Sequence, residues 1–143
     1  MSELSTFRLY LLRATYLLIV VGLGSDVWPA LIGHDASWTL WHGVGVSLLA
    51  AVTILAALGV RYPVRMLPLL LFELVWKTIW LAAIAVPLWS ADRIDAGTSE
   101  TILACGLGLV IFPAVIPWPY VVTHFVRQPG ERWRTGAPPE VRR

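Results

Sequence analysis

The chain has 143 residues, of which 57% are hydrophobic and 14% are charged, and its mean hydropathy is +0.71. Soluble globular domains carry roughly 25% charged residues, so the composition excludes an ordinary soluble domain and indicates an integral membrane protein. Eleven Lys and Arg against nine Asp and Glu leave a net charge of only +2, so the placement of the charges is more informative than their total.

One cysteine and the absence of a glycine-rich phosphate loop narrow the chemistry further. Cys105 alone cannot form an internal disulfide, a CxxC redox pair or a thiolate zinc site. Gly22 and Gly24 lie in an apolar run that lacks the strand and the helix of a phosphate-binding loop. We therefore expect no cofactor, and no nucleic acid as a partner.

Four stretches are long and apolar enough to cross a bilayer. A helix needs about 20 residues to span a hydrocarbon layer about 30 Å thick. The stretches are residues 9–29, 43–60, 66–89 and 101–125. The sequence therefore predicts an all-α integral membrane protein, a four-transmembrane-helix bundle in one domain of residues 1–126. Residues 127–143 hold five Arg and two Glu, and we expect a basic, disordered cytoplasmic tail that contacts anionic lipid head groups.

The first stretch, residues 9–29, has two interpretations. Basic residues precede its apolar core, and Gly22-Leu23-Gly24 is a weak match to a cleavage site, so the stretch could be a signal peptide. The segment from Ser25 to Pro29 is more typical of a helix end at a membrane interface. We favour a helix that is retained.

Two charged residues lie near the ends of this helix. Arg13 is one turn inside it, and its side chain either extends back to the cytoplasmic surface or crosses the bundle toward Glu73. Asp26 lies near the opposite end, where we interpret it as a hydrated carboxylate at a helix end.

The connection that follows, residues 30–42, contains two imidazoles and a carboxylate. His34, Asp35 and His42 could in principle bind a divalent metal ion. Their spacing is irregular, so we expect no metal site here.

The third stretch, residues 66–89, carries the most unusual side chains of the chain. On a helix, Glu73 and Lys77 are about 40° apart, and Trp76 and Trp80 fall on the same face. Counted from Pro68, Glu73 lies about 8 Å and Lys77 about 14 Å into a layer about 30 Å thick. Charges at such depth are costly, so they usually face the bundle interior and pair.

This polar face has a structural and a functional interpretation. Glu four residues before Lys is the favoured order for an intrahelical ion pair, so the two charges could simply neutralise each other and orient the helix. Alternatively, the face lines a small-ligand pocket or a polar path, because an aromatic wall with a few polar groups is typical of ligand sites. The candidate site consists of Glu73, Lys77, Trp76, Trp80 and Arg13.

The fourth stretch, residues 101–125, contains signals both for close packing and for a break. Ala104 and Gly108 are four residues apart, and so are Gly43, Ser47 and Ala51 in the second stretch, so backbones can approach closely there. Pro113, Pro117 and Pro119 each remove a backbone donor. We expect a kink or an early end near Ile116, followed by an interfacial segment that ends at Phe125.

The distribution of basic residues predicts the orientation of the bundle. Arg93 alone falls on one side of the predicted helices. The nine arginines on the other side are Arg8, Arg13, Arg61, Arg65, Arg127, Arg132, Arg134, Arg142 and Arg143. Cytoplasmic loops of membrane proteins are enriched in Lys and Arg. We therefore expect a multi-pass protein of the cytoplasmic (inner) membrane with both termini in the cytoplasm.

Residues 8–22 read RLYLLRATYLLIVVG, and a second helix rich in small residues ends in ALGVR at residues 57–61. In this pattern the first half of the chain resembles the DoxX-like group of small four-helix bacterial membrane proteins. The segment FELVWKTIW at residues 72–80 is more similar to an uncharacterised family of small bacterial membrane proteins. The resemblance implies a subunit of a membrane oxidoreductase system linked to thiol, sulfur or quinone metabolism.

Three functions remain as hypotheses. The short loops and the absence of a catalytic constellation favour an accessory, assembly or small-ligand-binding subunit without catalysis of its own. Its partners would be the lipid bilayer and either a membrane protein complex or a second copy of the chain. One alternative is a small dimeric proton-coupled transporter that uses Glu73. The other is a membrane oxidoreductase subunit acting on quinone or lipid, with Glu73 and Lys77 as an acid–base pair beside Trp76 and Trp80.

Overall fold

The computed structural model describes residues 4–131 and residue 133, and this part of the chain forms helices and no strand. Four helices are long and apolar enough to cross a membrane: Thr6–Ile32, Leu40–Arg61, Leu67–Ser90 and Ala96–Val115. The all-helical class and the four candidate spans agree with the sequence prediction. Most of the predicted tail, residues 127–143, lies outside the described residues.

Two of the long helices contain a wider π-helical turn. The first comprises α1 (Thr6–Leu18), a π-helical segment Ile19–Leu23 and α2 (Gly24–Ile32). The third comprises α4 (Leu67–Trp80), a π-helical segment Leu81–Ala85 and α5 (Val86–Ser90). The second helix, α3 (Leu40–Arg61), and the fourth, α6 (Ala96–Val115), are uninterrupted. Single π-helical turns inside α-helices occur frequently at functional sites.

Three of the helices begin earlier than their apolar runs, because a polar side chain caps each of them. The oxygens of Ser5, Thr39 and Asp95 accept hydrogen bonds from backbone N–H groups three residues further on, at 3.2, 3.2 and 2.7 Å. Such caps satisfy helix-end donors that have no partner within the helix. The hydrogen bond from the Thr98 backbone N–H lowers the pKa of the Asp95 carboxyl.

The fourth apolar stretch, residues 101–125, is divided near Ile116, where the sequence predicted a kink or an early end of the helix. Ile116 is extended, with ψ of 125°, and α6 therefore stops at Val115, where the prolines predicted an early end. A separate short helix follows, formed by α7 (Trp118–Val121) and the π-helical segment Val122–Arg127. The Trp118 indole N–H donates to the Pro113 carbonyl at 2.8 Å, which fastens the new helix to the end of α6.

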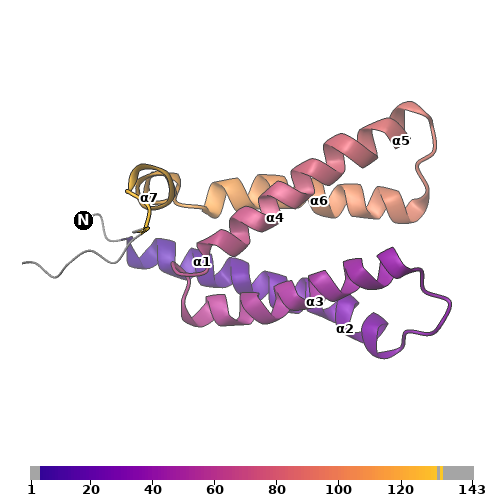
Figure 1. Ribbon diagram of the computed structural model, residues 1–143, viewed down its shortest axis with the longest axis horizontal. Helices are drawn as coiled ribbons and strands as arrows, with labels where there is room; N and C mark the ends of the chain where they lie inside the picture. The colour runs from indigo at the N-terminus through magenta and orange to yellow at the C-terminus, as the bar shows by residue number, and fades with distance from the viewer. Residues whose placement is uncertain (1–3, 132, 134–143) are drawn as a thin grey trace, which may run out of the picture.

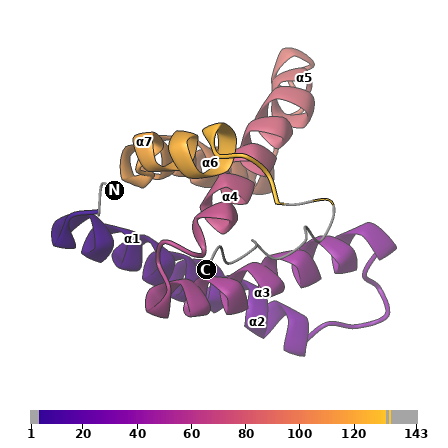
Figure 2. The ribbon, with the colours of Figure 1, turned by 60° about the vertical axis from the view of Figure 1, so that its left-hand side comes forward.

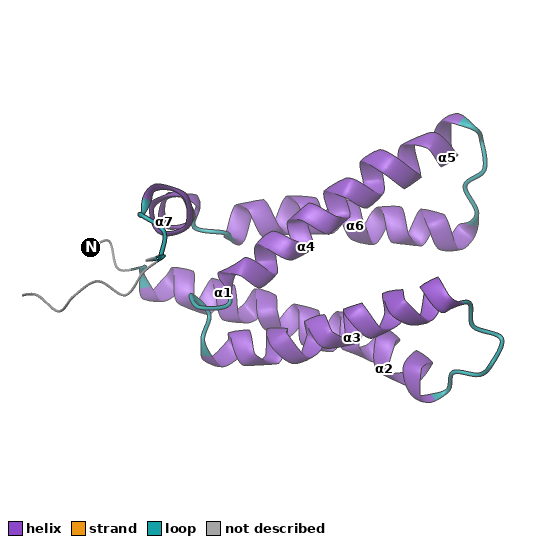
Figure 3. Cartoon of the chain, viewed as in Figure 1, coloured by secondary structure: helices purple, strands orange, loops and turns teal. Residues whose placement is uncertain are grey.

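The four long helices form two helical hairpins that diverge from each other (Figure 1). The hairpin of α1–α2 with α3 and the hairpin of α4–α5 with α6 meet near the start of α1, and a view turned by 60° shows the same divergence (Figure 2). The connections 33–39 and 91–95 lie at the open end, and the connection 62–66 lies at the closed end together with α7 (Figure 3).

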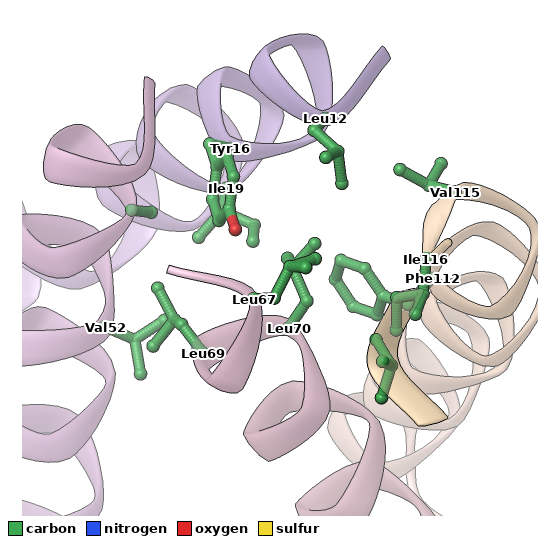
Figure 4. Close-up of a cluster of buried hydrophobic side chains, with 12 residues drawn as sticks. Leu12, Tyr16, Ile19, Val52, Leu67, Leu69, Leu70, Phe112, Val115 and Ile116 are labelled. Atoms are coloured by element: carbon green, nitrogen blue, oxygen red, sulfur yellow. The ribbon is translucent and has the colours of Figure 1, made fainter. Parts of the chain in front are cut away.

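A cluster of buried apolar side chains joins the hairpins at the closed end (Figure 4). Side chains of α1, such as Leu12 and Tyr16, face Leu67 and Leu70 of α4 and Phe112 of α6. The Tyr16 hydroxyl donates to the carbonyl of Pro63 at 2.8 Å, so the core also holds the connection between the hairpins. Burial of these side chains fixes the start of α4, and thereby the position of the residues that follow on it.

Two arginines of α1 satisfy the carbonyl ends of other helices. Arg8 Nη1 donates to the carbonyls of Ala114 and Val115 at 3.2 and 3.1 Å, and Arg13 Nε donates to the carbonyl of Val60 at 3.1 Å. The last carbonyls of a helix lack partners within it and carry partial negative charge, so a guanidinium is stabilising there. These two arginines therefore connect α1 to the ends of α6 and α3.

Candidate functional site

Glu73 and Lys77 form an ion pair along α4. The Lys77 ammonium donates to Glu73 Oε2, and the pair has the four-residue spacing expected from the sequence. Glu73 is only 1% exposed, and the Lys77 side chain is 12% exposed. The predicted intrahelical pairing is thus confirmed, and the core at the start of α4 places the carboxylate in the interior.

Lys77 is further surrounded by aromatic rings and a glycine. Its Nζ lies 4.2 Å from the centre of the Trp76 ring and 5.4 Å from that of Phe112, so the ammonium contacts two aromatic faces. A Cβ added at Gly108 would lie 2.8 Å from both Cδ and Cε of Lys77. Gly108 therefore provides the space on α6 in which the lysine stem packs.

Two buried polar atoms on α4 have no hydrogen-bond partner among the described residues. They are Glu73 Oε1 and the indole Nε1 of Trp76. Buried polar groups are normally hydrogen-bonded, and an unpaired one costs free energy. The carboxylate oxygen can only accept and the indole N–H can only donate, so each selects the kind of ligand group that could satisfy it.

Glu73 and Lys77 form part of the wall of a cavity between the two hairpins. Its volume is about 490 Å³, which falls within the range of small-molecule sites. Asp26 is its third ionisable residue. The rest of the wall is apolar or glycine, contributed by Leu18, Ile19, Gly22, Leu23, Ala104, Leu107, Gly108, Ile111 and Phe112. The π-helical turn Ile19–Leu23 supplies one side of the cavity and α6 the other.

Trp76 lines a second cavity, between α3 and α4. This cavity has a volume of about 430 Å³, and its wall is almost entirely apolar, with His42 as its titratable residue. Trp41 and Phe72 supply further aromatic rings. Trp80, which the sequence grouped with Trp76, lines neither of these two cavities. The aromatic wall therefore forms from Trp41, Phe72 and Trp76 rather than from Trp76 and Trp80.

Arg13 is not brought together with the ion pair. Its guanidinium caps α3 at Val60 and lies 5.7 Å from the centre of the Tyr10 ring. Of the two interpretations of Arg13, contact with Glu73 is therefore not realised. Asp26, which the sequence presented as a hydrated helix end, is exposed but lines the Glu73 cavity.

His34, in the connection between α2 and α3, and His42, in the first turn of α3, pack against the same tryptophan. Trp38 lies between His34 and His42, with ring centres 5.7 and 4.4 Å apart, and Asp35 accepts hydrogen bonds from Ser37. These hydrogen bonds lower the pKa of the Asp35 carboxyl. Within residues 4–131 and 133, no group of three or more His, Cys, Asp or Glu side chains could hold a metal ion.

Sequence reasoning missed several residues of the cavity. Gly22, Phe112 and the π-helical turn carried no recognisable signal, because their role depends on which helix faces α4. Gly108 was identified only as a small residue for close helix packing, whereas the structure gives its space to the side chain of Lys77. A small residue such as Gly108 on a neighbouring helix, at the depth of Lys77, is the one sequence signal that could have indicated the part of the site formed by α6.

Comparison with known proteins shows no matching family model, no similar curated protein and no similar solved structure.

Proposed function

We propose that this chain is a multi-pass protein of a bacterial inner membrane that binds a small amphiphilic ligand within the bilayer, as an accessory subunit without catalysis of its own. The observation that carries the proposal is the cavity lined by Glu73 and Lys77: its wall is apolar or glycine apart from these two residues and Asp26, and the buried Oε1 of Glu73 has no hydrogen-bond partner among the described residues. An apolar cavity with a few polar groups suits a ligand with an apolar body and a polar head.

Gly22 offers a way to fill this cavity without disturbing the fold. It lines the cavity, and a Cβ built on it meets no atom within 4 Å. Leucine also favours helix more than glycine does, so Gly22→Leu should not weaken the first long helix. Gly106 on α6 has the same open surroundings but does not line the cavity, which makes Gly106→Leu the matched control.

The test is native mass spectrometry of the protein transferred from its own membranes into nanodiscs, with identification of bound small molecules and proteins. We expect one specific small molecule on the wild type and on Gly106→Leu, and its loss from Gly22→Leu, because the leucine occupies the cavity. Identical bound molecules on all three proteins would contradict the ligand-binding role. A stoichiometric protein partner without a small molecule would favour assembly instead.

A second candidate is the binding of a ring-bearing ligand such as a quinone between α3 and α4, in an oxidoreductase complex of the kind the DoxX-like resemblance implies. The unpartnered indole N–H of Trp76 beside the aromatic wall favours it, because a ring carbonyl could accept that hydrogen bond. Gly45 lines this second cavity and also has open space around its Cβ. A molecule lost from Gly45→Leu but kept by Gly22→Leu would therefore support this candidate.

A further inference from the structure

The charges around the Glu73 cavity do not balance. Its lining contains two carboxylates, Asp26 and Glu73, and one ammonium, Lys77. Lys77 is paired with Glu73, and the remaining wall is apolar or glycine. Since Lys77 neutralises Glu73, the excess negative charge of the lining is that of Asp26, which is exposed.

The unpartnered atom of the pair is an acceptor. Glu73 Oε2 accepts from Lys77, whereas Glu73 Oε1 is buried without a hydrogen-bond partner among the described residues. An ionised carboxylate can only accept hydrogen bonds, so a ligand completes this site by donating one. Hydrogen bonds between charged groups are about twice as strong as those between neutral ones.

Lys77 is poorly placed to attract an anionic head group instead. Its ammonium is held by Glu73 and lies over the rings of Trp76 and Phe112, so its positive charge is already compensated. An anion that approached it would also meet the carboxylates of Glu73 and Asp26 in the same cavity. Like charges in a site of low dielectric constant repel strongly.

We propose that the ligand of this cavity is an amphipathic cation, such as an alkylammonium, whose N–H donates to Glu73 Oε1 while its apolar body contacts the wall formed by the π-helical turn and α6. Asp26 belongs to α2, which lies toward the open end of the molecule, and it attracts the cation at that side (Figure 1). This inference rests on the proposed function, since it names the ligand class of the same cavity.

The test compares three amphiphiles with the same ten-carbon chain: decylammonium, decanol and decyl sulfate. Their binding is measured by equilibrium dialysis against the protein in phosphatidylcholine nanodiscs, and binding to the Gly22→Leu variant is subtracted as partition into the bilayer. We expect the Gly22→Leu-sensitive binding of decylammonium to be tighter than that of decanol by about tenfold or more, in line with charge-assisted hydrogen bonds. Decyl sulfate should show none.

Two variants test whether the carboxylates of Glu73 and Asp26 cause the tighter binding of decylammonium. In Glu73→Gln/Lys77→Met the buried pair is removed together, so decylammonium should lose its advantage while decanol still binds. Asp26→Asn should weaken decylammonium binding by only about two- to fivefold, because this carboxylate is exposed. An unchanged advantage in both variants would overturn the proposal.

The outcomes separate the ligand class from the proposed function. If decanol or decyl sulfate binds as tightly as decylammonium and is displaced by Gly22→Leu, the cationic ligand class is wrong while the ligand-binding function stands. If no amphiphile binds differently to the wild type and to Gly22→Leu, both proposals fail.

Discussion

Glu73 and Lys77 are stabilised by different neighbours, although they form one ion pair. Glu73 follows the buried residues Leu67 and Leu70 on α4 and is itself buried, while Lys77 packs its stem against Gly108 and its ammonium against two rings. Removing one member leaves the other charge buried without its partner. Such a change is far more costly than removing both, because the desolvation penalty of the remaining charge is no longer offset.

The different costs of removing one charge and of removing both can be measured in a double-mutant cycle. We expect Glu73→Gln and Lys77→Met each to lower the free energy of unfolding by about 3–5 kcal/mol, and the double variant to remain close to the wild type. The measurement is unfolding by a denaturing detergent, followed by circular dichroism. Gly106→Leu serves as the control for a substitution away from the pair, since Gly106 does not line the Glu73 cavity and a Cβ at this position meets no atom within 4 Å. Additive losses in the double variant would show that the two charges do not depend on each other.

The sequence predicted the pair but not its surroundings. The spacing of Glu73 and Lys77 on one helix fixes their contact, because it depends only on helix geometry. The roles of Gly108, Phe112 and Arg13 depend on how the helices pack against one another, and hydropathy carries no information on this. Trp80 is a residue that the sequence assigned to the site but that the structure does not place there: it shares a helix face with Trp76 and lines neither cavity.

At the scale of elements, the existence of the four long helices followed from length and hydropathy, whereas their ends did not. Capped by Ser5, Thr39 and Asp95, three helices start before the predicted stretches 9–29, 43–60 and 101–125, because capping is a local hydrogen-bonding property. Prolines marked the end of α6 near Ile116, since they remove backbone donors. The π-helical turns were not predictable from the apolar pattern.

The contact between α1 and α3 depends on a glycine. A Cβ added at Gly59 would lie 2.6 Å from Cδ1 of Tyr16, a ring that is fully buried and held by its hydrogen bond to Pro63. The ring cannot easily move away, so the two helices would have to separate. Overpacking of this kind costs about 1–3 kcal/mol.

We therefore expect Gly59→Ala to destabilise the protein although alanine favours helix more than glycine does by about 1 kcal/mol. Gly106→Ala receives the same gain in helix propensity without a clash, because nothing lies within 4 Å of its Cβ. Thermal unfolding of both variants in detergent, followed by circular dichroism, should give a lower midpoint for Gly59→Ala than for Gly106→Ala. Equal midpoints would mean that the Tyr16 ring moves away from the added methyl group without loss of stability.

At the scale of the whole molecule, the two hairpins are joined at one end and diverge toward the other. Their junction includes the apolar cluster, the hydrogen bond from Tyr16 to Pro63 and the caps that Arg8 provides for α6. The cavity with Glu73 lies between the hairpins. The number of helices followed from the sequence, but this arrangement did not, because it depends on contacts between residues far apart in the chain.

Successive helices run in opposite directions (Figure 1), so the two ends of the molecule can be labelled separately to test which end faces the cytoplasm. The connection 33–39 lies at the end of the molecule opposite to α7, so in a membrane the two lie on opposite sides (Figure 3). The arginine bias predicts that α7 is cytoplasmic and that the connection 33–39 faces outward. Ala36 and Gln128 are exposed positions in these two regions, and Cys105, the one natural cysteine, is buried.

A membrane-impermeant maleimide applied to intact cells should distinguish the two orientations. In a Cys105→Ser background, we expect Ala36→Cys to be labelled in intact cells, and Gln128→Cys to be labelled only after the cells are opened. Labelling both variants in opened cells checks that each cysteine is accessible. The reverse pattern in intact cells would invert the orientation and place Asp26, with the open end of the hairpins, toward the cytoplasm. A cationic ligand would then have to enter the cavity from inside the cell.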